Sequence, residues 1–337
     1  MSLPDSDWNV LIEQGRKTQL LGQLVALLQR EKLLDNVPAA VLRHLVLVQR
    51  NITRRNESSQ WEVITLRRVI DPKIPLLLLK GCAYVACADE NAAGRVFSDM
   101  DILVRRQDLP VVESDMMSVG WMPHRMNDYD LGYYRNWMHE VPPMTHVRRH
   151  TVVDLHHAIN PPVSRFYIPT DKLFELAQEV SPGVFVLCAV DRIIHCVLHL
   201  LQEGESTKLM RDLYDLHLLR RQHLRCATDW AMLRQRAISL NVAPLIESAL
   251  GAAQIIFSRD SLSDESLGWL PVCLAHAARD AKGDSTLRGQ LAGLALLVFS
   301  HWLKMPMHLL VPHLMHKSRA RMRFRSSLGQ EKISTPE

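Results

Sequence analysis

Cysteine is scarce in this 337-residue sequence, and its six cysteines include no pair in the C-x-x-C spacing. A chain of this length with so few cysteines is not built on a disulfide framework. The missing C-x-x-C pair excludes the usual zinc ribbon. Because 47% of the residues are hydrophobic, the chain can bury a sizeable core, and we expect reduced thiols within it.

Long apolar runs are also missing. The longest stretch near the C-terminus without Lys, Arg, Asp or Glu runs from Gly289 to Leu303 and has 15 residues. An α-helix needs ~20 residues to cross a bilayer. The first seven residues, Met-Ser-Leu-Pro-Asp-Ser-Asp, are acidic and do not have the basic and then apolar layout of a signal peptide. We therefore expect a cytoplasmic protein.

The body of the chain has no excess of charge. The whole sequence has 40 Lys and Arg against 36 Asp and Glu, a formal net charge of +4. Residues 317–337 hold six basic and two acidic side chains, which leaves 34 of each sign before them. A nucleic-acid-binding protein usually has a basic face on its folded body, so binding of nucleic acid by this body is not expected. The basic tail is typical either of weak contact with an anionic membrane surface or of a solvated extension.

Hydrophobic periodicity predicts helices at both ends of the chain and a small α/β unit between them. Strands are expected at residues 74–79, 101–104 and 151–156, with another beginning at Trp121, and a helix at 108–120. The helices expected before this unit lie within 11–28, at 37–48 and at 61–70, with a polar connection over 51–60. The helices expected after it are 171–179, 189–202, 209–219, 230–240, 244–257, 270–281 and 287–305.

This order of elements predicts an α+β fold, in which a small mixed sheet is flanked by N-terminal helices and a C-terminal all-helical region. We divide the chain into an N-terminal helical segment (1–72), an α/β core (73–165), a C-terminal helical domain (166–316) and a basic tail (317–337). Functional residues concentrate where such a scaffold holds loops and strand ends. The chemistry is therefore expected in the α/β core.

Two aspartates stand two residues apart in the segment Ser98-Asp99-Met100-Asp101-Ile102-Leu103-Val104. Side chains alternate along a strand, so Asp99 and Asp101 are expected on one face. Adjacent carboxylates repel unless a cation lies between them, and Mg²⁺ suits such a site. Asp154 stands in another apolar strand; if the strands are neighbours, three carboxylates converge as ligands for two-metal phosphoryl transfer. The alternative is a surface edge paired with arginines such as Arg95 or Arg105.

A Lys-Gly pair, Lys80-Gly81, follows the apolar strand upstream of these aspartates. A glycine between a strand and a helix lets the backbone approach a phosphate, and the first N–H groups of the helix favour negative charge. Such a pair is also common in ordinary turns. The ordered set is more informative: an apolar strand, Lys-Gly, about twenty residues, Asp-x-Asp and, about fifty residues later, a strand aspartate.

These segments resemble a known family. The chain resembles the bacterial nucleotidyltransferase-like proteins of the DNA polymerase β superfamily. The resemblance is carried by Ile74-Pro75-Leu76-Leu77-Leu78-Leu79-Lys80-Gly81-Cys82-Ala83-Tyr84, by Arg95 and by the Asp99–Val104 segment. The similar branch is the uncharacterised one often encoded beside exopolysaccharide or peptide-modification genes. Other segments resemble its later strand and its helical half: Val153-Asp154-Leu155-His156, Ile194–His199, Asp212–Asp215 and Asp229-Trp230. The resemblance covers residues 10–250.

The resemblance implies a Mg²⁺-dependent nucleotidyltransferase that moves a nucleotide from an NTP, ATP in first place, to a hydroxyl of a small molecule, a sugar or a protein. Asp99, Asp101 and Asp154 are then the metal-binding and catalytic carboxylates, arranged for two ions. Asp154 is either a metal ligand or the base that takes the proton of the acceptor hydroxyl. The nucleotide-binding positions are then Lys80, Gly81, Cys82 and Ser98.

One departure from the superfamily supports a different function. The superfamily usually has Gly-Ser after the first strand, where the serine contacts a phosphate, and this sequence has Gly81-Cys82. The alternative is therefore a catalytically inactive adaptor that uses the same fold to bind a partner in a polysaccharide or peptide-modification pathway.

Several histidines and aspartates in other positions have less specific patterns. His195 and His199 are one helical turn apart, which suits a transition-metal hydrolase, but no H-E-x-x-H motif is present and a pair of core or groove histidines is the alternative. His156 lies on the Asp154 face of its strand, either to assist a proton or as a hydrogen-bonded structural group. Asp212 and Asp215, near Arg211, favour salt bridges between helices over an acceptor site.

Overall fold

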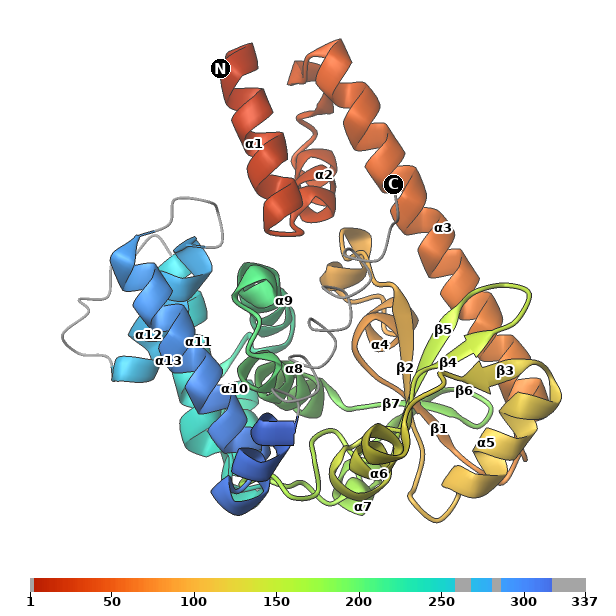
Figure 1. Ribbon diagram of the computed structural model, residues 1–337. Helices are drawn as coiled ribbons and strands as arrows, with labels where there is room; N and C mark the ends of the chain where they lie inside the picture. Colours follow the sequence, from red (N-terminus) through yellow and green to blue (C-terminus); the bar gives the residue numbers. More distant parts are fainter. Residues whose placement is uncertain (1–2, 258–267, 281–285, 317–337) are drawn as a thin grey trace, which may run out of the picture.

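The computed structural model describes residues 3–257, 268–280 and 286–316 (Figure 1). In this part of the chain the fold is α+β, as predicted, with a seven-stranded mixed sheet flanked by N-terminal and C-terminal helices. The strands are β1 (Leu76–Leu78), β2 (Asp99–Leu103), β3 (Trp121–Pro123), β4 (Met144–His146), β5 (Val152–His156), β6 (Gln178–Ser181) and β7 (Val184–Val186). Their order across the sheet is β3-β4-β5-β2-β1-β7-β6, and the β1/β7 and β2/β5 pairs are parallel.

The helices fall into three groups along the chain. Those before the sheet are α1 (Asp5–Lys17), α2 (Leu21–Arg30), the 3₁₀ turn η1 (Leu34–Asn36) and α3 (Ala39–Val69). Those between its strands are α4 (Lys80–Ala86), the 3₁₀ turn η2 (Glu90–Ala93), α5 (Leu109–Ser118), α6 (Asp128–Trp137) and α7 (Thr170–Phe174). Those after it are α8 (Ala189–Glu203), α9 (Ser206–His223), α10 (Ala227–Ser239), α11 (Ala243–Phe257), α12 (Trp269–Asp280), α13 (Leu287–Lys304) and a last helix, Met307–His316.

The two faces of the central strands belong to two different hydrophobic cores. Leu76, Leu78, Met100, Ile102, Val153 and Leu155 pack into one core with residues of α3 and α5. Leu77, Leu79 and Leu103 pack into the other core with α8 and α9. Because side chains alternate along β2 and β5, Asp99, Asp101 and Asp154 leave the sheet on the side of α8 and α9. Figure 1 shows these helices beside that face of the sheet.

One long helix replaces two of the predicted ones. α3 continues through residues 51–60, where we expected a polar connection, so that prediction is wrong. The segment contains no Pro or Gly to end the helix. Its buried residues Leu45, Ile52, Ser59 and Leu66 recur every seven positions, which keeps one face of α3 in contact with the protein throughout.

The predicted helix at 171–179 is also wrong in its second half. α7 ends at Phe174, and residues 178–181 form β6, which pairs with β7 in a hairpin. Gly183, at a φ of +72°, allows the tight turn between them. The four residues of β6 are exposed, so the strand had no hydrophobic alternation to reveal it. β7 pairs with β1, and the sheet therefore extends into the segment that we assigned to the C-terminal helical domain.

Other elements follow the predictions within a few residues. α5 and α8 to α13 are confirmed, and so are the strands at β1, β2, β3 and β5. β4, β7 and α6 were not predicted.

Among the described residues, no single helix is long and apolar enough to cross a membrane, although α13 and Met307–His316, bent by 115°, meet the length and composition criteria as a pair. The predicted basic tail, 317–337, lies outside the described residues.

Candidate active site

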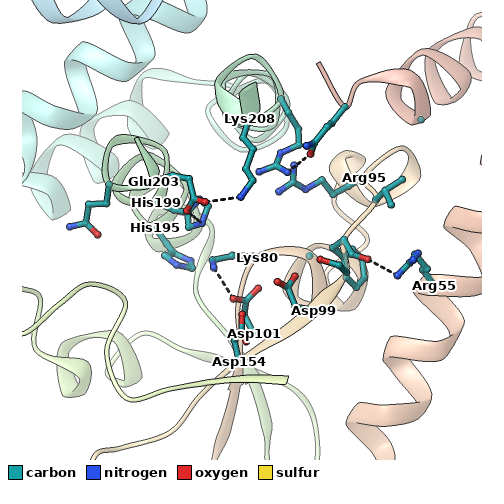
Figure 2. A pocket seen from close by; sticks show the side chains of 18 of the residues that line it. Arg55, Lys80, Arg95, Asp99, Asp101, Asp154, His195, His199, Glu203 and Lys208 are labelled. Atoms are coloured by element: carbon teal, nitrogen blue, oxygen red, sulfur yellow. Dashed lines mark hydrogen bonds and ion pairs between the residues drawn. The ribbon is translucent and has the colours of Figure 1, made fainter. Parts of the chain in front are cut away.

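The three predicted carboxylates come from two neighbouring parallel strands. In the register of β2 and β5, Asp101 pairs with Asp154 and Asp99 pairs with Val152. Cross-strand partners point to the same face of a sheet, as do residues two apart in one strand. The structure thus brings Asp99, Asp101 and Asp154 to one face, and Figure 2 shows their carboxylates along the same wall of a pocket.

That pocket has a volume of about 720 Å³ and is lined by all three parts of the chain. Its size lies within the range of ~300–1,000 Å³ that is usual for small-molecule sites. Figure 2 shows Lys208, Glu203 and His199 of the C-terminal helices across from the aspartates, with Arg95 beside them. The lining residues from the N-terminal part of the chain include Arg16, Gln19 and Arg55. The pocket therefore offers an acidic wall and several cations at its other sides.

Asp101 is the most tightly held of the three aspartates. Its side chain is buried, and its Oδ1 accepts hydrogen bonds from Lys80 Nζ at 2.7 Å and His156 Nε2 at 3.0 Å. Burial alone would raise the pKa of Asp101, but the Lys80 ammonium and His156 outweigh it and hold this pKa well below its usual range. Asp101 is therefore an ionised carboxylate at neutral pH.

Lys80 reaches Asp101 from an uncommon backbone conformation. It is the first residue of α4 and has a φ of +45°, in the left-handed region that residues other than glycine rarely adopt. Such a conformation costs on the order of 1–3 kcal/mol and is more frequent at functional sites than elsewhere. The N–H group of Leu79 donates to the carbonyl of Asp101 at 3.0 Å, which fixes the start of α4 against β2.

Asp154 has an oxygen without a partner. Among the described residues, its Oδ1 is buried and makes no hydrogen bond. Burial, together with the nearby Asp101 and Glu140 carboxylates, raises the pKa of Asp154 to about 7. A buried carboxylate oxygen without a donor is costly. Hard divalent cations prefer carboxylate oxygens, and this sheet face offers three carboxylates, one of them with an unpaired oxygen. These residues therefore fit the implied Mg²⁺.

The predicted nucleotide-binding residues are only partly on the pocket wall. Lys80, Gly81 and Ser98 line it, whereas Cys82 is buried in the core between the sheet and α3. A Cβ on Gly81 would lie 2.6 Å from the ring of Phe97, so this glycine is needed for the close approach of that ring. Burial also raises the pKa of the Cys82 thiol. The position where the superfamily usually has serine therefore faces the core.

Two neighbours of the aspartates were not predicted. His139, Glu140 and His156 each have a ligand atom within 4.8 Å of the others, a possible metal-binding group. A β-bridge between Glu140 and His156 holds them together, and the N–H group of His157 donates to the carbonyl of His139 at 2.8 Å. The Asp99, Asp101 and Asp154 side chains do not form such a tight trio among the described residues. Nothing in the local sequence of 139–140 indicates a contact with the end of β5.

Most of the pocket's cations were also missed. Lys208 forms ion pairs with Glu203 at 2.8 Å and Glu205 at 3.0 Å. Lys304, the last residue of α13, lines the pocket, and burial lowers its pKa. These side chains come from helices that are distant in sequence, so their convergence was not visible in any motif.

The aspartates of α9 have a structural role that agrees with the sequence. Arg95 forms ion pairs with Asp212 at 3.5 Å and Asp215 at 3.2 Å, and Arg211 pairs with Asp212 at 2.7 Å. Arg95 precedes β2, so these pairs tie the sheet to α9. This arrangement also makes Arg95 unavailable as the surface partner of Asp99 that we considered.

His195 and His199 line the pocket, but they belong to no group of three possible metal ligands within 4.8 Å in the described part of the chain. His199 Nε2 lies 3.4 Å from Glu203. Burial lowers the pKa of both histidines, to about 3 for His195, so they are neutral groups of the pocket wall. The structure gives no support to a metal hydrolase built on this pair.

Comparison with known proteins identifies a family. The search of curated proteins and the search of solved structures each gave no match. The model of a family described as uncharacterised nucleotidyltransferase matches residues 4–258, from the N-terminal helices through the sheet to α11. This match covers more than half of the chain, and the chain therefore belongs to the uncharacterised nucleotidyltransferase family.

Proposed function

We propose that the protein is a Mg²⁺-dependent nucleotidyltransferase that moves a nucleoside monophosphate from an NTP, ATP in first place, to a hydroxyl acceptor. The observation that carries the proposal is the register of β2 and β5, which places Asp101 opposite Asp154 with Asp99 two residues away. These three carboxylates share a pocket with Lys80 and Lys208. Family membership supports nucleotidyl transfer in general.

Asp99, Asp101 and Asp154 are the residues that would hold divalent ions. Mg²⁺ bound there would neutralise the charge of the triphosphate and favour an ionised acceptor hydroxyl. The orphaned Oδ1 of Asp154 supports this assignment. Lys80 forms an ion pair with Asp101, so one cation already balances part of the negative charge of this wall.

The cations of the pocket would bind and orient the triphosphate. Lys80 lies beside the carboxylates, and Lys208 lies across from them in Figure 2. Both ammonium groups have acidic partners, so an incoming phosphate would exchange one anionic partner for another. This positioning would hold the α-phosphorus near the aspartate wall.

The chemical step would be a substitution at that phosphorus. The acceptor oxygen forms a bond to the α-phosphorus, the bond from this phosphorus to the bridging oxygen of the β-phosphate breaks, and pyrophosphate leaves with that electron pair. Asp154 would accept the proton of the hydroxyl on the carboxylate oxygen that holds no ion. Burial and the neighbouring carboxylates raise the pKa of Asp154, so it takes up a proton more readily than Asp101 does.

The acceptor would be a small molecule, a sugar or a protein, without a nucleic-acid template. Residues 1–316 hold equal numbers of basic and acidic side chains, which supports this choice. Arg16, Gln19 and Arg55 of the N-terminal part of the chain also line the pocket and would donate hydrogen bonds to the acceptor substrate.

Isothermal titration calorimetry with ATP, with and without Mg²⁺, tests the proposal. Wild-type protein is expected to bind ATP more tightly with Mg²⁺, and the Asp99→Asn/Asp101→Asn variant is expected to lose that gain. Asp171→Asn, which removes an exposed carboxylate paired with Arg105, is the matched control. Unchanged Mg²⁺-dependent affinity in the double variant would overturn the proposal. An inactive adaptor would instead show no pyrophosphate release with any NTP.

A further inference from the structure

The outer face of α13 carries an apolar stripe. Leu287, Leu291, Leu294 and Val298 follow one another at helical spacings of three and four, and each is between 58% and 72% exposed. The opposite face of α13 is buried, through Ala292, Leu296 and Leu303, in the core of the C-terminal helices. α13 thus has one face in the protein and an equally apolar face outside it.

The last helix, Met307–His316, continues this arrangement. His313 stacks on Tyr133 with ring centroids 4.4 Å apart, and His316 stacks on Tyr129 at 3.6 Å, so α6 holds one side of the helix. Its large apolar residues on the other side are exposed: Met307, Val311, Leu314 and Met315. We call these residues and the stripe on α13 the C-terminal apolar surface.

The sequence around this surface contains no acidic residue. From Thr286 to Gln330 there is no Asp or Glu, and there are seven Lys or Arg, five of which fall between Lys317 and Arg325. Anionic lipid attracts such a one-sided charge, at about 1 kcal/mol for each basic residue near the surface. The family match ends at residue 258, so this part of the chain is additional to the matched region.

We propose that the C-terminal apolar surface docks on an anionic membrane, with α13 lying flat at the interface. Apolar side chains on one helix face, with basic residues close in the sequence, are features of a segment that binds in the headgroup region. Because the other face of α13 is packed against the protein, the helix is suited to lie on the membrane surface. Lys304, at the end of α13, lines the pocket, so the pocket would open near the lipid.

Vesicle co-sedimentation of the full chain tests this inference independently of any enzyme activity. The protein is expected to sediment with vesicles of phosphatidylcholine and phosphatidylglycerol and to stay in solution with phosphatidylcholine alone. The Leu291→Glu/Val298→Glu variant is expected to bind the anionic vesicles at least about tenfold more weakly, because two apolar side chains lose their burial. Replacing Arg319, Arg321, Arg323 and Arg325 with Gln is expected to weaken binding and to reduce its sensitivity to salt.

The matched control is Met232→Glu/Ile238→Glu, which changes two exposed apolar residues of α10 and is expected to bind as the wild type does. Circular dichroism of each variant checks that the helices remain folded. Equal vesicle binding by the α13 variant and the wild type would overturn the inference. So would a wild-type dimer, seen by light scattering, that ignores vesicles and dissociates in the α13 variant, because the surface would then bind a second copy of the chain.

Discussion

Asp101 and Asp154 are direct partners across the parallel strands β2 and β5, yet their surroundings differ. Oδ1 of Asp101 accepts two hydrogen bonds, from Lys80 and His156, while Oδ1 of Asp154 has no partner among the described residues. The same pair of strands thus presents one ionised carboxylate and one whose pKa is raised to about 7. In the proposed reaction the two carboxylates have different roles, so we expect substitutions of Asp101 and of Asp154 to have different consequences.

The first prediction concerns Asp154. Asp154→Asn is expected to slow pyrophosphate release by about 10²-fold or more, because the substitution removes the proton acceptor, and to weaken ATP binding much less. Rate measurements at saturating ATP, together with calorimetric affinity, separate the two effects. A variant that releases pyrophosphate at the wild-type rate would show that Asp154 is not the base.

The second prediction concerns Lys80. Lys80→Ala is expected to reduce ATP affinity about tenfold or more, because a charge-assisted contact with phosphate is lost. Lys73→Ala, at an exposed lysine before β1, is the control and should leave affinity unchanged. Equal ATP affinities in the Lys80 variant and the wild type would place the triphosphate elsewhere in the pocket.

The third prediction concerns stability away from the site. Glu62 of α3 is buried and accepts hydrogen bonds from Arg149 at 2.6 and 2.8 Å and from Thr151 at 2.9 Å. Arg149→Ala is expected to lower the free energy of unfolding by about 3 kcal/mol, because the Glu62 carboxylate loses its counter-charge.

Urea unfolding provides the measurement for this prediction, and Arg135→Ala is its control. Arg135 forms a similar two-bond pair with Glu113, but its side chain is 45% exposed, so a loss of at most about 1 kcal/mol is expected. Equal losses in the two variants would contradict the importance that we assign to burial.

The fourth prediction concerns pH. Burial, followed by Arg220 and Arg221, lowers the pKa of His217 from 6.5 to about 4. Between these pH values the unfolded chain binds a proton that the folded chain does not, so this histidine makes the protein less stable as pH falls through that window.

His217→Gln is therefore expected to show a smaller drop in melting temperature between pH 7 and pH 4.5 than the wild type. His44→Gln, at an exposed position on α3, should behave as the wild type does. If the melting temperature of the His217 variant depended on pH as that of the wild type does, the lowered pKa of His217 would be contradicted.

Local patterns predicted the part of the fold that holds the carboxylates. The strands β1, β2 and β5 were predicted, and alternation along β2 put Asp99 and Asp101 on one face. The prediction left open whether the strand of Asp154 is their neighbour, and the register of β2 and β5 makes it so. We predicted a connection at 51–60 because the stretch is polar. It contains no Pro or Gly to end a helix, and it forms the middle of α3. β6 was missed because its four residues are exposed and its strand character comes from pairing with β7.

The rest of the site depends on contacts that are distant in sequence. Arg16, Lys208 and Lys304 reach the pocket from three separate helices, and His139 and Glu140 meet His156 through a single β-bridge. Each residue is unremarkable in its own segment. The burial of Cys82 is also a property of packing, since the helix that begins at Lys80 turns this side chain toward the core.

The central claim is that the aspartates of β2 and β5 hold divalent ions together with the nucleotide. The most direct test is electron paramagnetic resonance of Mn²⁺, titrated with a non-hydrolysable ATP analogue into the wild type, Asp99→Asn/Asp101→Asn and Glu140→Gln. We predict about two Mn²⁺ ions bound by the wild type, a loss of this binding in the aspartate variant, and its retention in Glu140→Gln. Undiminished Mn²⁺ binding in the aspartate variant, with loss in Glu140→Gln, would contradict the account and assign the ions to the His139, Glu140 and His156 group.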